Sequence, residues 1–219
     1  MKKIYFTSAF VIAAFAFNAK AQSLAFHKGS FIIGVSEGST AADYGTNDGM
    51  HQAHHYIDGE RDPLTLEYGI SKHWGVGINI GGDIFKVNPT VFYGIDGLAS
   101  DTKAITSEFT LDANYHFFVT KRTDLSLVGS FGTSSVSLKG DNLDQSYQYI
   151  ATGGIVRLGL HAKYYFWKRL GVQAMYSIYS ANNNSTKDVK GNTFGNNYST
   201  TLKGRALEFG FVFRFGKIN

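Results

Sequence analysis

The stretch Leu207–Gly216, which reads LEFGFVFRFG, decides the fold class of this chain. A leucine and four phenylalanines occupy every second position, and Glu208, Gly210, Val212 and Arg214 stand between them. A period of two is typical of a β-strand, because successive side chains point to opposite faces of the sheet. Four phenylalanines on one face are a costly surface in water. The stretch therefore predicts a strand with one strongly apolar face and one mixed face.

The same alternation recurs in seven other segments, which are residues 30–36, 64–71, 74–81, 108–117, 125–131, 156–166 and 170–178. One face of these segments is rich in Leu, Ile, Val and aromatic residues. The other face carries glycines together with Glu67, Asp83, Glu108, Asp112, His116, Arg157, His161, Lys163, Glu208 and Arg214. No segment beyond the N-terminus has enough consecutive apolar residues for a membrane-spanning helix. Eight alternating segments predict an all-β fold.

The overall composition excludes several classes of protein. The chain has 219 residues, of which 43% are hydrophobic, 17% charged and 15% aromatic, with 25 Gly, 2 Pro and no Cys. This is too apolar for a disordered chain and too polar for a bundle of membrane helices. The absence of cysteine excludes disulfide scaffolds and thiolate metal sites. A length near 200 residues suits a single β-barrel.

The N-terminus has the features of an export signal. Lys2 and Lys3 precede an apolar run over residues 4–17, and Ala19-Lys20-Ala21 supplies the small residues that a signal peptidase reads. The run is too short to span a bilayer as a helix, which needs about 20 residues. We therefore expect residues 1–21 to be a cleaved signal peptide and residues 22–219 to form one barrel domain.

The net charge does not support nucleic-acid binding. The formal charge of +4 includes Lys2, Lys3 and Lys20, and no acidic residue stands in the signal. Its removal leaves a nearly neutral chain without a basic stripe.

The connections between the predicted strands alternate in length. Three are tight, at residues 72–74, 118–124 and 167–169, and each contains a lysine (Lys72, Lys121 and Lys168). Four are long and polar, at residues 38–62, 85–103, 139–152 and 180–202. Long loops at one end and short turns at the other are typical of transmembrane β-barrels.

A soluble lipocalin-like barrel would also show alternation, but with the polar face outside. Glycines on a solvent face would weaken its strands, whereas small residues and paired charges suit the narrow interior of an eight-stranded barrel. Trp74 and Trp167, the only tryptophans, flank two of the tight turns and predict an aromatic girdle at one membrane interface. These features favour a membrane barrel over a soluble one.

The chain resembles the outer-membrane β-barrel domain family (OmpA/OmpX-like), in the versions common in Bacteroidota. The resemblance rests on the signal ending at Ala21, the hairpin segments 68–72 and 164–169, and the terminal strand Leu207–Gly216. It implies an eight-stranded antiparallel barrel in the outer membrane, with short periplasmic turns, long extracellular loops and both termini in the periplasm. Family members often end on an aromatic residue, whereas residues 216–219 follow Phe215 here.

The resemblance also suggests the partners of the chain. We expect a monomer that contacts outer-membrane lipids, the barrel-assembly machinery and periplasmic chaperones, and that binds no nucleic acid. Specificity for an extracellular ligand would reside in the long loops, which carry the aromatic residues Tyr44, Tyr56, Phe92, Tyr93, Tyr147, Tyr149 and Tyr198.

Three groups of residues raise the question of specific chemistry. His51, His54 and His55 could hold a divalent cation with a nearby carboxylate, but a solvated loop is the simpler interpretation. His116 and His161 could serve an outer-membrane lipid hydrolase, but they lie on polar faces and suit an interior ion-pair network better. The pairs Gly81-Gly82 and Gly153-Gly154 have no helical pattern after them, so they indicate strand ends or bulges and no phosphate cradle.

These considerations assign no catalytic, cofactor or metal residue. The leading hypothesis is a non-enzymatic protein with a structural or surface-interaction role. The alternatives are a small passive pore, a lipid-modifying enzyme and a soluble lipocalin-like binder.

Processing at the predicted signal gives the first test. Because Ala19-Lys20-Ala21 is the small-x-small site that follows the apolar run, we expect the mature protein to begin at Gln22. Mass spectrometry of the protein isolated from membranes measures this directly. An intact Met1 would contradict the prediction.

Overall fold

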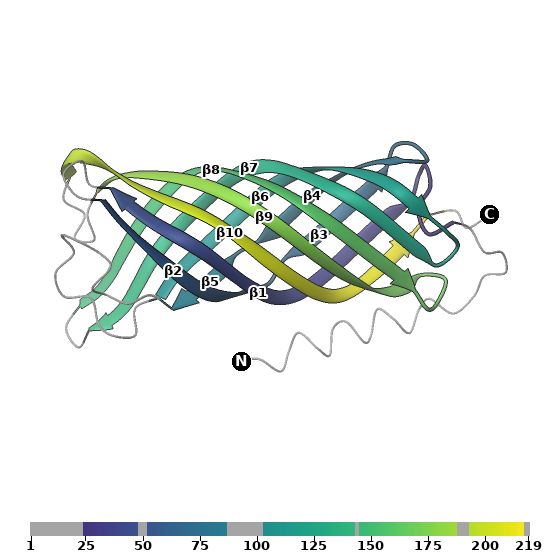
Figure 1. Cartoon of the computed structure of the whole chain (residues 1–219), viewed down its shortest axis with the longest axis horizontal. Coiled ribbons are helices and arrows are strands. Elements are labelled where there is room, and N and C mark those ends of the chain that lie inside the picture. The colour runs from purple at the N-terminus through teal and green to yellow at the C-terminus, as the bar shows by residue number, and fades with distance from the viewer. Residues whose placement is uncertain (1–23, 48–51, 87–102, 143–144, 188–192, 217–219) are drawn as a thin grey trace.

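The computed structural model describes residues 24–47, 52–86, 103–142, 145–187 and 193–216. Within them the chain forms ten antiparallel strands (Figure 1). The strands are β1 (Phe31–Asn47), β2 (Gln52–Arg61), β3 (Leu64–Gly69), β4 (Trp74–Gly81), β5 (Asp83–Lys86), β6 (Lys103–Val119), β7 (Thr123–Asn142), β8 (Gln145–Tyr165), β9 (Leu170–Lys187) and β10 (Thr193–Phe215). In these residues no helix is long and apolar enough to cross a membrane.

The strands close into a ring. From β6 to β10 each strand pairs with the next along the chain, and β10 returns to pair with β1 from Phe31↔Phe215 to Asn47↔Ser199. β2 and β3 both pair with β1, one beyond the other, and β4 and β5 both pair with β6. Each of these two couples therefore makes one interrupted barrel strand, and the ten elements form the eight-stranded barrel that the sequence predicts.

The two interruptions follow from local chemistry. Pro63 separates β2 from β3 and has no N–H to donate to the sheet. Gly82 separates β4 from β5, and a Cβ there would lie 2.2 Å from the backbone oxygen of Thr106. The pair Gly81-Gly82 therefore marks a strand end, as expected. Gly153-Gly154 does not, because both residues pair regularly with β7 in the interior of β8.

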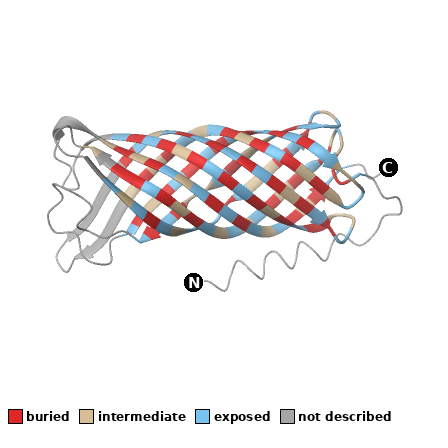
Figure 2. Cartoon of the chain, in the orientation of Figure 1, coloured by how far each residue is buried: buried red, intermediate tan, exposed pale blue. Residues whose placement is uncertain are grey.

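The outer wall of the barrel carries an apolar belt. Buried and exposed residues alternate along every strand (Figure 2). The exposed positions hold the large apolar side chains, including Phe109, Leu158 and Phe209, which have between 47% and 59% of their surface accessible. The aromatic residues at the end with the tight turns include Tyr68, Trp74, Tyr115, Tyr164 and Trp167, all exposed. This confirms the inside–outside assignment and the aromatic girdle.

The polarity of the two faces is reversed farther along the strands. On β10 the outer face changes from Leu207 to Arg205, while the lumen face changes from Glu208 to Ala206. Strands β7, β8 and β10 have 20, 21 and 23 residues, whereas about 9–11 residues cross a bilayer. The barrel therefore continues beyond the membrane, where water replaces lipid outside and apolar side chains fill the interior.

The extension corrects the prediction of long polar loops. Most of residues 38–62, 139–152 and 180–202 belong to strands. Their sequence suggests loops because polar residues face water there, and the apolar residues that face the lumen are small, such as Ala151 and Ala181. The predicted loop 85–103 begins within β5, ends in β6 and otherwise lies outside the described residues.

The position of the belt predicts how much folding free energy a charge on the outer face costs at different points along the strands. Phe211 is exposed at the middle of the belt, so Phe211→Arg should cost about 2–4 kcal/mol of folding free energy in lipid. Thr133 is exposed on the outer face of β7 just beyond Phe131, and Thr133→Arg should cost at most about 1 kcal/mol. Unfolding titrations in phospholipid vesicles measure both. Equal costs would show that the belt is misplaced.

Candidate functional site

Charged side chains fill the middle of the lumen and form two networks. The first network is centred on Arg61, which is fully buried. Its guanidinium lies 3.2 Å from Asp83, 3.0 Å from Glu108 and 2.8 Å from Glu208. Arg157 adds a second cation, 2.7 Å from Glu108. These residues come from β2, β5, β6, β8 and β10, so the network spans the lumen from wall to wall.

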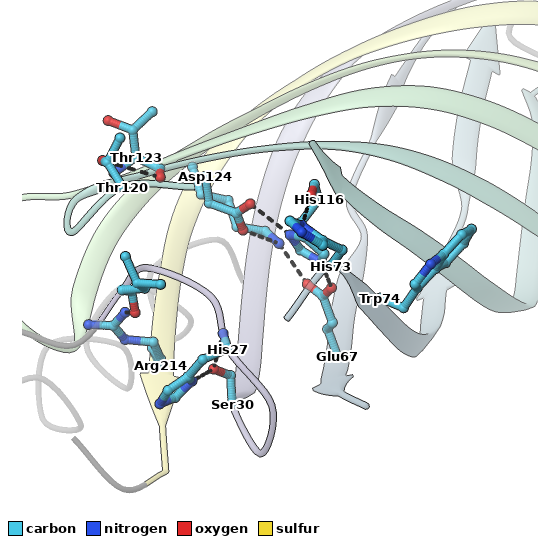
Figure 3. A network of polar contacts seen from close by, with 12 residues as sticks. His27, Ser30, Glu67, His73, Trp74, His116, Thr120, Thr123, Asp124 and Arg214 are labelled. Atoms are coloured by element: carbon cyan, nitrogen blue, oxygen red, sulfur yellow. Dashed lines mark hydrogen bonds and ion pairs between the residues drawn. The ribbon is translucent and has the colours of Figure 1, made fainter. Parts of the chain in front are cut away.

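The second network lies nearer the tight turns and is centred on His116 (Figure 3). The two ring nitrogens of His116 lie 2.7 Å from Glu67 and 2.7 Å from Asp124. Lys163 donates to both carboxylates, at 2.6 Å and 3.4 Å. Ionised carboxylates only accept hydrogen bonds, so with both ionised the two ring nitrogens must both donate and the ring is cationic. The two cations then balance the two carboxylates.

The segment that precedes β1 closes the lumen at the same end. Phe26 is fully buried and stacks on His116, with ring centroids 3.4 Å apart and planes 9° apart. The amide of Ala25 donates to the carbonyl of Thr120 at 2.7 Å. Arg214 donates to the carbonyl of Leu24 and, at 2.7 Å, to that of Lys168. Phe26 thus covers the second network from the mouth of the barrel.

An apolar cluster fills the lumen on the far side of the first network. It contains Ala42, Tyr44, Ile57, Phe85, Ala104, Val136, Ala151, Ile155, Tyr179, Ala181, Leu202 and Ala206, all buried. Tyr179 also joins the cluster to the charged layer, because its ring lies 4.7 Å from the guanidinium of Arg157 and its hydroxyl lies 2.8 Å from that of Thr40. The interior is therefore layered, with charge in the middle and apolar groups at both ends.

The alternating pattern predicted part of the charged interior. It placed acidic and basic side chains on the inner face, where opposite charges can pair, without specifying which ones meet. Glu67 pairs with Lys163 and Glu108 with Arg157, whereas Asp112 and Arg214 make other contacts. Asp112 accepts from the hydroxyl of Thr110 at 2.9 Å, and Arg214 bonds backbone carbonyls and lies 4.8 Å from the ring of Tyr165. A face assignment does not specify which partners meet across the lumen.

Sequence reasoning missed the central residue, Arg61. It stands next to Asp62 and Pro63, which are turn residues, and it therefore fell within the predicted loop 38–62. One signal in the sequence could have found it, because Ile57, Gly59 and Arg61 alternate with the polar residues Asp58 and Glu60 in a short period of two. His161 lies inside the barrel as expected, where its ring nitrogen lies 3.2 Å from the side-chain oxygen of Gln173.

Two of the three clustered histidines lie in a strand and not in a solvated loop. His51 lies outside the described residues, and His54 and His55 are successive residues of β2, so they point to opposite faces. His54 lies on the outer face, 3.5 Å from Asp43. No group of metal-binding side chains occurs in the described part of the chain.

The loop aromatics also need correction. Tyr44 is fully buried in the apolar cluster, whereas Tyr56 is 63% exposed on the outer face of β2. Tyr147, Tyr149 and Tyr198 belong to strands β8 and β10, and residues 92–93 lie outside the described residues.

The sequence carries the signature of a known class. The family model described as "Outer membrane protein beta-barrel domain" matches residues 7–215. The chain therefore belongs to this family, whose members are proteins of the outer membrane. No curated protein sequence matches the chain.

Several solved structures are similar to this chain at low identity. The attachment invasion locus protein Ail of Yersinia pestis is 16% identical, with 85% of this chain and 99% of that chain covered and a TM-score of 0.43. OprG from Pseudomonas aeruginosa is 15% identical, with 87% and 98% covered and a TM-score of 0.48. The outer membrane protease OmpT from Escherichia coli is 8% identical, with 90% and 99% covered and a TM-score of 0.44.

The central arginine provides a test of the interior. Arg61→Met should destabilise the barrel by about 3–5 kcal/mol, because it leaves several buried carboxylates short of a cation. The matched control is Lys86→Met, since Lys86 is exposed on the outer wall. Unfolding titrations of both variants in vesicles measure the difference. A loss below about 1 kcal/mol at Arg61 would contradict the role of the network.

Proposed function

We propose that this protein is a closed, non-enzymatic barrel that performs a structural or surface-interaction role. The observation that carries the proposal is the filled lumen. From one end to the other, the interior holds Phe26, the His116 network, the Arg61 network and the apolar cluster. A barrel of eight strands leaves room for little more than side chains.

The charged groups of the lumen support a structural role over a catalytic one. A general base or nucleophile needs access to a substrate atom. His116 is enclosed by two carboxylates and the ring of Phe26, and Lys163 by the same two carboxylates. Because these groups contact one another, their reactive atoms are not open to a substrate.

The part of the barrel beyond the membrane is the natural place for surface interaction. Its strands are paired with their neighbours, as β1 is with β10 and with β2, and this pairing holds the wall rigid. It carries exposed polar groups such as Tyr56, Asp58 and Arg205. An interaction surface on strands holds its geometry better than one on long loops. We therefore assign recognition to this projecting wall.

A passive pore is the second candidate, and one observation favours it. On the inner face of the strands, Asn79 Oδ1, Asn114 Oδ1 and Ser126 Oγ are buried without a hydrogen-bond partner among the described residues. Water bound there would satisfy them. Such waters would hydrate the charged middle of the lumen. Phe26 on one side and the apolar cluster on the other would still close it.

Conductance separates the two candidates. In planar bilayers, we expect the purified full-length protein to give no large, persistent current, because paired charges and packed side chains obstruct the lumen. Heat-modifiable mobility in gels must first show that the sample is folded. Steady channels that pass small sugars would overturn the closed barrel and establish the pore.

A further inference from the structure

The two ends of the barrel differ in exposed charge. At the end with the tight turns, the solvent-accessible cations of the described residues are Lys28 before β1, Lys72 between β3 and β4, Lys121 and Arg122 between β6 and β7, and Lys168 and Arg169 between β8 and β9. Among the described side chains, every exposed carboxylate lies instead within residues 37–62, away from the tight turns. We call the six cations the basic rim.

The backbone holds the basic rim in one ring. The amide of His116 donates to the carbonyl of His73, that of Tyr165 to Arg122, and that of Arg214 to Arg169, at 2.7, 2.7 and 2.8 Å. Each bond joins a turn to the neighbouring strand. These bonds tie the turns that carry the cations to the barrel, and the turns lie together at one end of it (Figure 1).

Within the described part of the chain, the basic rim has no compensating acid. None of its six side chains forms an ion pair with a carboxylate of the described residues. Of the acids that the structure describes, Glu67 and Asp124 lie near this end, and both are buried and already paired with His116 and Lys163. A ring of uncompensated cations repels itself, so an external anion would lower its energy.

The position of the rim identifies that anion. Lys72 is two residues from Trp74, and Lys168 follows Trp167, so the cations lie immediately beyond the aromatic girdle. Aromatic girdles lie at the level of the lipid headgroups, and long basic side chains beside them reach the phosphates. We propose that the basic rim binds the headgroups of anionic phospholipids in the periplasmic leaflet and enriches them around the barrel.

The two tryptophans make the proposal measurable. They are the only tryptophans of the chain, and both are exposed beside the rim. The full chain is refolded into vesicles of equal parts phosphatidylcholine and phosphatidylglycerol, with either lipid brominated so that it quenches tryptophan fluorescence. Both leaflets have the same composition, so the orientation of insertion does not matter. We expect brominated phosphatidylglycerol to quench about twofold more strongly, and the excess to fall at high salt.

Matched variants show whether the rim is responsible. Lys72→Gln/Lys121→Gln/Lys168→Gln removes three rim charges and should bring the two quenching strengths close to equality. Lys86→Gln/Lys103→Gln/Lys203→Gln removes three exposed cations from the far half of the barrel and should leave the excess unchanged. Equal quenching by both lipids in the unmodified protein would overturn the proposal. So would an excess that survives in the rim variant.

Discussion

The hydrocarbon core of a bilayer cannot hydrogen-bond to a peptide group, and the rest of this structure depends on that constraint. A strand in the bilayer must pair on both edges, and a sheet satisfies this only by closing on itself. Here closure is made by β10, which pairs with β1 over the whole length of β1. Closure with eight strands then fixes a narrow lumen, so every side chain on the inner face must find its partner within that space.

The narrow lumen explains why the interior charges form networks and not isolated pairs. Removing an ion from water is expensive, and a single partner rarely compensates for it. Arg61 meets three carboxylates, and Glu67 and Asp124 share both His116 and Lys163. Glycines make room for these groups. At Gly75, for example, a Cβ would lie 2.4 Å from a carboxylate oxygen of Glu67.

The surrounding medium decides which face of a strand is apolar. Within the belt, apolar side chains face the lipid and charged side chains face the lumen. Beyond the belt, polar side chains face water and apolar side chains fill the lumen. The change falls between Ala206 and Leu207 on β10, without any break in the strand. One regular backbone thus serves two environments, because hydrogen bonding along the ladder does not depend on the side chains.

The sequence by itself determined the strand type, the two faces within the membrane and the positions of the tight turns. These are local properties, because a period of two and a turn residue act over a few neighbouring positions. The tertiary structure alone decided how far the strands continue, since polar residues facing water look like loops in sequence. It also decided which charges meet. Arg61 and Glu208 are 147 residues apart, and Phe26 reaches His116 only after the barrel has closed. Such contacts depend on closure across the whole chain, and no local pattern encodes them.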